Sequence, residues 1–143
     1  MDRQRFQDWL DAYIKAWKTY DEASVEALFS EDVDYRYHPN SDPVHGRAAV
    51  VASWLDNKDD PETYDAKYEV LAIDGEVHVG HGRSQYFEGP GGKLRDEYFN
   101  VYVCRFNDAG ECTEFTEYWM QNSEFRRRAR EALIAKVRAG EPV

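Results

Sequence analysis

The residues best suited to chemistry lie together in residues 33–47, which read VDYRYHPNSDPVHGR. Tyr35, Arg36, Tyr37 and His38 come where a short aromatic strand is predicted to end and a polar turn begins. A strand end is a frequent position for chemistry, because a rigid element holds side chains that solvent and ligand can still reach. His38 is a candidate acid or base, because the unperturbed pKa of histidine lies near neutral pH. The alternative is that His38, which precedes a proline, only caps the turn.

Length and composition indicate one domain with many aromatic side chains. The chain has 143 residues, which is typical of a single domain, and we expect that domain to include residues 1–143. It is 42% apolar and 15% aromatic, with ten tyrosines and four tryptophans. Because Tyr and Trp carry a polar group on an apolar body, they suit the wall of a mixed polar and apolar cavity.

The charge of the chain argues against two classes of partner. There are 28 acidic and 18 basic residues, which give a net charge of −10. Nucleic-acid binders need a positive surface that displaces counterions, so we expect no nucleic-acid partner. Adsorption to an anionic membrane is disfavoured for the same reason.

The cysteines and the N-terminal residues bear on cofactors and location. Cys104 and Cys112 flank a predicted turn at residues 107–110, so they lie on the two arms of one hairpin. Pairing Phe106 with Glu111 would set the cysteines diagonally, so we expect no disulfide, and two thiols alone form no metal site. No metal or nucleotide motif is present, so no cofactor is expected. The charged N-terminus has no apolar signal segment, which predicts a cytosolic protein.

Helices are predicted in the first part of the chain. Residues 2–20 carry apolar residues at three- and four-residue spacing, which indicates a helix with one aromatic face. Asp21 is a good N-cap for a short helix to residue 28 or 29. Residues 30–32 are predicted to break that helix before a strand at 33–37, and a third helix is expected at 46–56. The aromatic face consists of Phe6, Trp9, Leu10, Tyr13, Ile14 and Trp17, of which Tyr13 and Trp17 are the candidates for a role beyond core packing.

From residue 63 the apolar period falls to two, which is typical of strands. We expect strands at about 63–74, 76–87, 94–106 and 112–121, with a bulge after Val70, and a last helix that Ser123 caps. In the second of these strands, Gly80, Gly82 and Ser84 share one face and His81 lies on the other. The segregation of helices from an antiparallel sheet predicts an α+β fold, with the sheet strongly bent around the first helix.

Four phrases of the sequence carry a family resemblance: AYIKAWKTYDEASVEALFSEDV, HPNSDPVHGRAAVVASWL, VYVCRFNDAGE and FTEYWMQN. Over residues 5–122 the chain resembles the nuclear transport factor 2-like superfamily, in its SnoaL-like and ketosteroid isomerase-like branch. The resemblance implies a cystatin-like α+β barrel, a cone of strongly curved, mostly antiparallel sheet closed by N-terminal helices. It also implies an internal ligand pocket and frequent homodimers. The branch contains isomerases, cyclases, dehydratases, epoxide hydrolases and non-catalytic binders.

The resemblance also implies roles for single residues. The tyrosine that stabilises an oxyanion in the isomerases falls on Tyr13, and the second oxyanion donor, an aspartic acid there, falls on Tyr102. The aspartate that serves as the base falls on His38 or, one residue earlier, on Tyr37. The pocket tryptophan of the last strand falls on Trp119. Both isomerase carboxyls are therefore missing, and ketosteroid isomerase activity itself is not expected.

Glu117 stands where the isomerases are apolar. With the inward faces set by the resemblance, Glu117 would meet Tyr13 and Tyr102 in one cavity. A buried carboxyl needs a partner or a raised pKa. Glu117 would either do acid–base work or form a structural ion pair with Arg83. The resemblance places the following further side chains around this cavity: Trp17, Trp54, His81, Arg83 and Trp119.

Three functions remain open from the sequence. The first is a cofactor-independent isomerase, dehydratase or hydrolase for a small, partly apolar molecule, in which Tyr13 and Tyr102 stabilise an oxyanion and His38 or Glu117 moves protons. The second is a module that binds such a ligand without chemistry. The third, which is compatible with either, is a homodimer formed through an exposed sheet face. That face would carry Phe99, Val101, Val103 and Tyr118.

Overall fold

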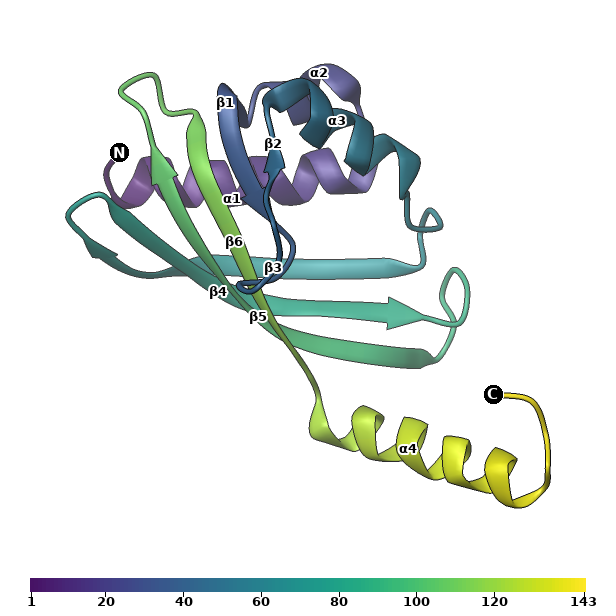
Figure 1. Cartoon of the computed structure of the whole chain (residues 1–143). Coiled ribbons are helices and arrows are strands. Elements are labelled where there is room, and N and C mark those ends of the chain that lie inside the picture. Colours follow the sequence, from purple (N-terminus) through teal and green to yellow (C-terminus); the bar gives the residue numbers. More distant parts are fainter.

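The computed structural model describes all residues, 1–143, as four helices and six strands (Figure 1). Strands β5 and β6 have the predicted bounds, and the register of β3 shifts between Val70 and Ala72, where the bulge was expected. The elements are α1 (Arg3–Thr19), α2 (Glu22–Glu26), β1 (Phe29–Arg36), β2 (Val44–His45), α3 (Arg47–Asp56), β3 (Tyr64–Asp74), β4 (Val77–Phe87), β5 (Leu94–Phe106), β6 (Cys112–Gln121) and α4 (Ser123–Arg138).

Strand β1 is longer than the sequence predicted. It starts at Phe29, so the expected break at residues 30–32 is wrong. Phe29 pairs with Cys112 of β6, and the Cys112 N–H donates to the carbonyl of Leu28. The pairing with a distant strand therefore decides the conformation of a segment whose local sequence favours a turn.

The six strands form one sheet in the order β2-β1-β6-β5-β4-β3. All neighbouring strands are antiparallel except β1 and β6, which are parallel. The sheet is strongly curved, and α1, α2 and α3 lie on its concave side (Figure 1). This is the expected α+β cone, in which helices close a bent and mostly antiparallel sheet.

Two glycines of β4 allow the sheet to bend tightly around α1. A Cβ at Gly82 would lie 2.0 Å from the carbonyl oxygen of Lys67 on β3, so only glycine fits there. A Cβ at Gly80 would lie 3.0 Å from the side chain of Leu10 on α1. The missing side chains let β3 and α1 approach β4 closely.

The core lies between α1 and the concave face of the sheet. The predicted aromatic face of α1 is buried at Phe6, Trp9, Leu10 and Tyr13, and Trp17 packs at its margin. The side chain of Asp21 accepts from the backbone of Ser24 and caps α2, as expected. The buried aromatic face fixes α1 against the concave face of the sheet.

The two cysteines are free and buried on the arms of the β5–β6 hairpin. A register shift between Arg105 and Phe106 changes the predicted pairing, so that Cys104 lies opposite Phe115 and Cys112 opposite Phe106. The predicted pairing of Phe106 with Glu111 is therefore wrong.

Helix α4 leads away from the rest of the chain (Figure 1). None of its residues is buried. Its N-cap is Asn122, not the predicted Ser123, because the Asn122 side chain accepts from the N–H of Glu124. None of the four helices combines the length and the apolar character that crossing a membrane requires.

Candidate active site

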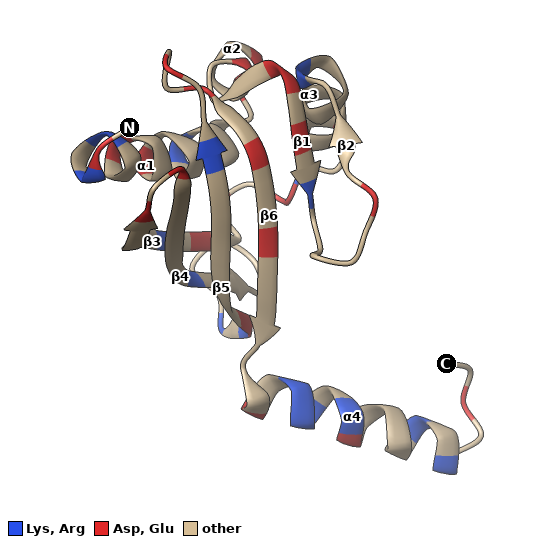
Figure 2. Cartoon of the chain, turned by 60° about the vertical axis from the view of Figure 1, so that its left-hand side comes forward, with Lys and Arg blue, Asp and Glu red and all other residues tan.

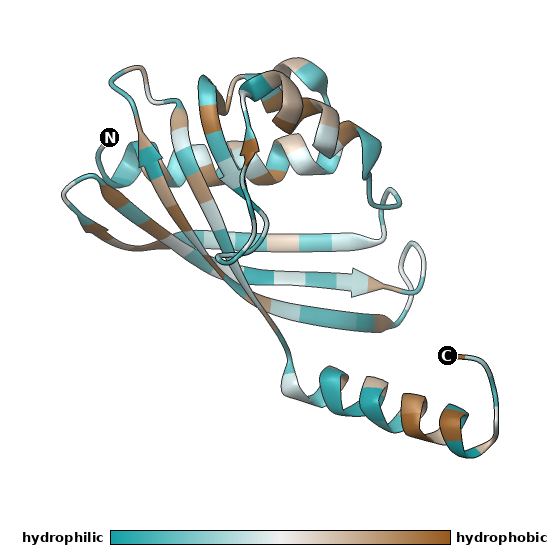
Figure 3. Cartoon of the chain, viewed as in Figure 1, coloured by the Kyte–Doolittle hydropathy of each residue, from teal (hydrophilic) through white to brown (hydrophobic).

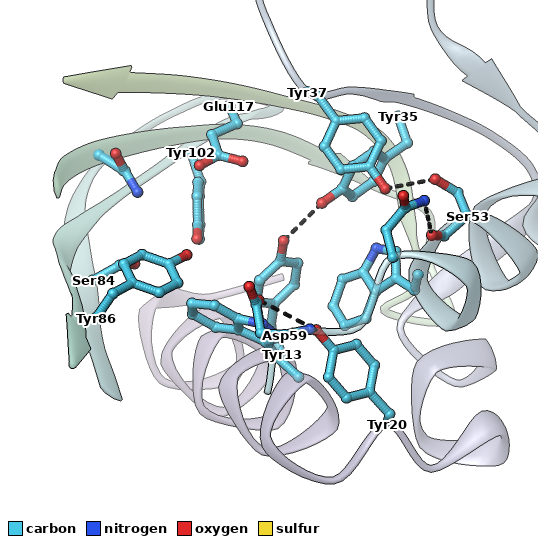
Figure 4. A pocket seen from close by; sticks show the side chains of 14 residues that line it. Tyr13, Tyr20, Tyr35, Tyr37, Ser53, Asp59, Ser84, Tyr86, Tyr102 and Glu117 are labelled. Atoms are coloured by element: carbon cyan, nitrogen blue, oxygen red, sulfur yellow. Dashed lines mark hydrogen bonds between the residues drawn. The ribbon is translucent and has the colours of Figure 1, made fainter. Parts of the chain in front are cut away.

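A cavity of about 460 Å³ lies between α1, α3 and the concave face of the sheet, a size that suits a small organic ligand. Figure 4 shows side chains from both helices and from β1, β4, β5 and β6 that point into it. Eight of the fourteen lining residues are hydrophobic. The lining residues are Tyr13, Trp17, Tyr20, Tyr35, Tyr37, Ser53, Trp54, Asn57, Asp59, Ser84, Tyr86, Asn100, Tyr102 and Glu117.

Glu117 is a carboxyl without a partner in this cavity. It lies on β6 directly opposite Tyr102 of β5, and residues that face each other across an antiparallel pair share one face of the sheet. Burial raises the pKa of Glu117 to about 7, and no hydrogen bond or cation offsets that effect. No Lys, Arg or His lines the cavity. Glu117 can therefore take up or release a proton near neutral pH.

Tyr13 and Tyr35 form a hydroxyl pair in the same cavity. Their oxygens are 2.7 Å apart (Figure 4), so one hydroxyl uses its proton in this bond and the other can donate to a ligand. Tyr102 stacks on Tyr68, with ring centroids 4.3 Å apart. Burial raises the pKa of Tyr13, Tyr35 and Tyr102 well above the usual value of a phenol, which keeps all three neutral.

The wall opposite Glu117 contains a carboxyl that hydrogen bonds hold in place. The side chain of Asp59 accepts from Trp17 Nε1 at 2.8 Å and from the Tyr20 hydroxyl at 3.3 Å (Figure 4). The Asp59 N–H donates back to the Tyr20 oxygen at 2.9 Å. These bonds fix the loop after α3 against α1 at the edge of the cavity. Asp59 therefore has a structural role in the cavity wall, whereas the Glu117 carboxyl has no hydrogen bond within the protein and can exchange a proton with a ligand.

A series of hydrogen-bonded side chains inside the sheet ends at the cavity. Asn100 Nδ2 donates to the Tyr68 hydroxyl at 2.7 Å, and that hydroxyl lies 2.8 Å from Ser84 Oγ. Asn100 is only 5% exposed. Its Oδ1 is the one buried side-chain oxygen or nitrogen of the protein without a hydrogen-bond partner.

The structure brings six of the ten predicted site residues into this cavity. Three of the remaining residues, His38, His81 and Arg83, lie outside it, and Trp119 borders a smaller hollow beside Glu117. Of the two alternatives for the end of β1, Tyr37 is the one that faces the cavity, where its hydroxyl lies 2.7 Å from Ser53 Oγ. The six are Tyr13, Trp17, Tyr37, Trp54, Tyr102 and Glu117.

His81 and Arg83 belong to the outer face of the sheet. His81 lies opposite Val101, and Arg83 lies opposite Phe99, whereas Tyr102 lies opposite Gly80. The expectation that they share a cavity with Tyr102 is therefore wrong, because facing residues point the same way. Arg83 lies 4.0 Å from Glu97, so its predicted ion pair with Glu117 is also wrong.

His38 lies in a hollow on the outer side of the sheet. Its Nδ1 accepts from Trp119 Nε1 at 2.6 Å, and the two rings meet edge to face. The side chains of Tyr35 and Tyr37 point toward the cavity. The chain has left the cavity wall by the time it reaches His38. A shared acid–base role of His38 with Tyr13 and Glu117 is therefore not supported by its position.

Several lining residues were not among the sequence candidates. Asn100 lies two residues before Tyr102 on the same strand, so the two side chains are on the same face. The sequence could therefore have predicted Asn100 in the cavity once Tyr102 was assigned to it. Asp59 gave no such signal, because a carboxylate in a polar turn is typical of solvated loops. Tyr35 was part of the cluster predicted at the end of β1 but had no role assigned to it. The residues missed altogether were Tyr20, Ser53, Asn57, Asp59, Ser84, Tyr86 and Asn100.

Residues 10–115 match the SnoaL-like domain family. The chain belongs to this family. It is thereby a member of the nuclear transport factor 2-like superfamily, as the sequence phrases indicated. The SnoaL-like match covers α1 from Leu10 onward, α2, α3 and the sheet as far as Phe115 in β6. The comparison with curated proteins finds no match.

Solved structures share the fold of this SnoaL-like chain. A protein of Kribbella flavida DSM 17836, provisionally assigned as a ketosteroid isomerase, has a TM-score of 0.64 at 18% identity, over 85% of this chain and 82% of that one. An LEH-like epoxide hydrolase of M. tuberculosis has 0.65 at 16%, over 93% and 97%. An NTF-2 like protein of unknown function from Burkholderia xenovorans LB400 has 0.62 at 14%, over 83% and 85%. These identities establish the fold, not the reaction.

Proposed function

We propose that this SnoaL-like protein is a cofactor-independent acid–base enzyme for a small, partly apolar molecule. The observation that carries the proposal is Glu117, an unpaired carboxyl with a pKa of about 7 that faces a cavity of about 460 Å³. A pKa near the working pH is what general acid–base catalysis requires. A purely structural carboxyl in this position would be expected to have a cation or a donor beside it.

The reaction that fits best is proton transfer next to a carbonyl group. The Glu117 carboxylate removes a proton from the carbon beside the carbonyl. The electron pair of that C–H bond forms a carbon–carbon double bond, and the π electron pair of the carbonyl group moves to its oxygen. A neutral phenol, from the Tyr13–Tyr35 pair or from Tyr102, donates a hydrogen bond to the oxyanion. In a ketone that carries a carbon–carbon double bond one position further along, protonated Glu117 then returns its proton to the far carbon of that double bond. The double bond moves next to the carbonyl group, which completes an isomerisation without any other reactant.

The lining disfavours an anionic ligand. Two carboxyls, Glu117 and Asp59, face the cavity, and no basic side chain does. A carboxylate or phosphate on the ligand would be repelled without any compensating cation. The rings of Trp17, Trp54 and Tyr86 supply apolar surface for the rest of the molecule.

Hydrolysis is the alternative reaction within the same proposal. The M. tuberculosis neighbour is described as an LEH-like epoxide hydrolase, and the Kribbella neighbour is provisionally assigned as a ketosteroid isomerase. In a hydrolase Glu117 would take a proton from water while a phenol donates to the leaving oxygen. The same cavity would also serve a binder that performs no chemistry.

We also propose that the protein forms a homodimer through the outer face of its sheet. The large side chains Phe99, Tyr118 and Met120 are 46%, 44% and 56% exposed there. Exposed apolar side chains that gather on one face favour an interface.

Turnover of ketones, enones, epoxides and lactones at about pH 6–8 tests the enzyme proposal. Glu117→Gln is expected to lower kcat/KM for a turned-over compound at least about hundredfold, because amides do not accept protons. Glu114→Gln is the matched control, since Glu114 lies on the outer face of the same strand beside Arg105. Tight binding of these compounds without turnover by the wild-type protein would instead identify a binder.

A further inference from the structure

Every apolar side chain that lines the cavity is aromatic. All eight belong to Tyr or Trp, so no Leu, Ile, Val or Met borders the cavity. The second half of β4, which forms part of the wall, is accordingly mostly pale or teal in the hydropathy colours of Figure 3. The face of an aromatic ring carries partial negative charge, so it attracts a cation as well as an apolar group.

The charged part of the lining is entirely negative. Besides four neutral Ser and Asn residues it contains the carboxyls of Asp59 and Glu117. The domain around the cavity is acidic too. Helix α4 has six basic and two acidic residues, a net charge of +4, whereas the chain as a whole carries −10 and its remainder therefore −14 (Figure 2). A cleft whose charges have one sign concentrates ligands of the opposite sign.

Both carboxyls keep an oxygen that a ligand can reach. The two hydrogen bonds to the Asp59 side chain end on Oδ2, and Oδ1 accepts none. Glu117 has no hydrogen bond at either oxygen. The only side-chain oxygen or nitrogen that is both buried and without a partner is Oδ1 of Asn100, so the free oxygens of Asp59 and Glu117 are accessible.

Asp59 lies beside two aromatic residues, and no cation pairs with it. Trp17 and Tyr20 donate to its Oδ2 at 2.8 Å and 3.3 Å, but an indole N–H and a phenol O–H leave the charge of the carboxylate in place. Lys58 Nζ lies 5.8 Å from the centre of the Tyr20 ring, yet Lys58 does not line the cavity. The cavity therefore contains no positive charge to balance Asp59.

We propose that the ligand of this cavity carries an alkylated ammonium group, which Asp59 holds through Oδ1 beside the rings of Trp17 and Tyr20. The inference rests on the proposed function and names its substrate class: small ketones with a cationic, alkylated nitrogen. The carbonyl group of such a ligand would lie toward Glu117 on the opposite wall. Aromatic side chains are the groups with which proteins recognise quaternary ammonium ligands, because the rings replace the weak hydration of an alkylated cation.

Two ketones of the same shape test the preference for charge. The ammonium ketone is 5-(trimethylammonio)pentan-2-one. The neutral ketone is 6,6-dimethylheptan-2-one, in which a carbon atom replaces the cationic nitrogen. Isothermal titration calorimetry measures both dissociation constants at about pH 8, where most of Glu117 is ionised. We expect the wild-type protein to bind the ammonium ketone at least about tenfold more tightly than the neutral one.

Substitutions in the loop after α3 assign the preference to Asp59. Asp59→Asn removes the charge but keeps an oxygen that can accept from Trp17 and Tyr20, and it should lower the preference at least about threefold. Asp60→Asn is the matched control, because Asp60 is exposed, carries the same charge and does not line the cavity. If Asp59→Asn does not fold, Asn57→Asp replaces it, and the carboxyl that it adds to the lining should raise the preference.

Equal affinity of the wild-type protein for the two ketones, or tighter binding of the neutral one, would overturn the inference. Equal losses of preference in Asp59→Asn and Asp60→Asn would overturn it too, because the charge of the whole chain would then explain the preference. Failure of the enzyme proposal has a different signature, namely a cation preference that depends on Asp59 with no turnover that depends on Glu117. Turnover that depends on Glu117 without any cation preference would reject the ammonium site alone.

Discussion

Glu117 and Asp59 are the two carboxyls of the cavity, and their surroundings differ. Glu117 has neither the hydrogen bond nor the cation that burial normally demands. Such an unsatisfied group lowers stability, and its position in a cavity is typical of a functional site. Asp59, in contrast, is held in place by the hydrogen bonds that its Oδ2 accepts from Trp17 and Tyr20.

The pKa of Glu117 predicts how stability depends on pH. The carboxyl titrates near 4.5 in the unfolded chain and near 7 when folded, because burial disfavours its charged form. Between these values the folded state binds more protons, so the free energy of unfolding falls as pH rises and levels off above about pH 7. We expect a fall of about 2 kcal/mol that is specific to this residue.

Urea denaturation at about pH 5 and about pH 8 measures this fall. Glu117→Gln should be more stable than the wild-type protein at the higher pH, and the difference should shrink at the lower one. The comparison with Glu117→Gln removes contributions of the histidines, which both proteins share. A wild-type protein that gains stability relative to Glu117→Gln on going from acid to neutral pH would contradict the burial of an unpaired carboxyl.

At the scale of elements, the curvature of the sheet makes the cavity. The bulge near Val70 and the close approach at Gly82 bend β3 and β4 toward α1. A flat sheet would hold Tyr102 and Glu117 away from the helices, and no enclosed volume would remain. The cavity thus depends on residues that carry no chemistry of their own.

Gly82→Ala should lower the free energy of unfolding by about 2–3 kcal/mol, because its Cβ would lie 2.0 Å from a backbone oxygen of β3. Gly80→Ala is the matched comparison, since its Cβ would meet the flexible end of Leu10 at 3.0 Å. The loss at Gly80 should be the smaller one when both variants are denatured with urea. Equal losses would mean that β3 can move away from β4 without cost.

At the scale of the whole molecule, charge is unevenly distributed. Lys and Arg recur along α4, whereas Asp and Glu are spread over the rest of the chain (Figure 2). An acidic domain attracts a cation from a distance, and mobile ions screen that attraction. The ammonium ketone should therefore bind more weakly at about 1 M than at about 0.1 M sodium chloride in calorimetry, whereas the affinity of the neutral ketone should not fall. An affinity for the ammonium ketone that salt leaves unchanged would mean that charge does not contribute to its binding.

Sedimentation velocity of the full chain tests the proposed dimer. The proposed interface is apolar at Phe99, Tyr118 and Met120, so Met120→Glu should shift the dimer toward the monomer. A wild-type monomer would contradict the proposal.

The sequence by itself determined the family, the α+β class, the bounds of β5 and β6 and the buried face of α1. These features follow from local periods and from motif phrases, which neighbouring residues encode. It also indicated Tyr13, Tyr102 and Glu117, which do converge on one cavity.

Only the tertiary structure decided which strand faces point inward together. His81 and Arg83 were misplaced because alternation within β4 does not say which of its faces shares a side with Tyr102, and that depends on register with β5. Long-range contacts also decide two other positions. Pairing with Cys112 of β6 extends β1 beyond its predicted start, and hydrogen bonds from Trp17 and Tyr20 hold Asp59, a residue of a polar turn, at the cavity wall. Contacts between residues far apart in the chain set these positions, and no local pattern records them.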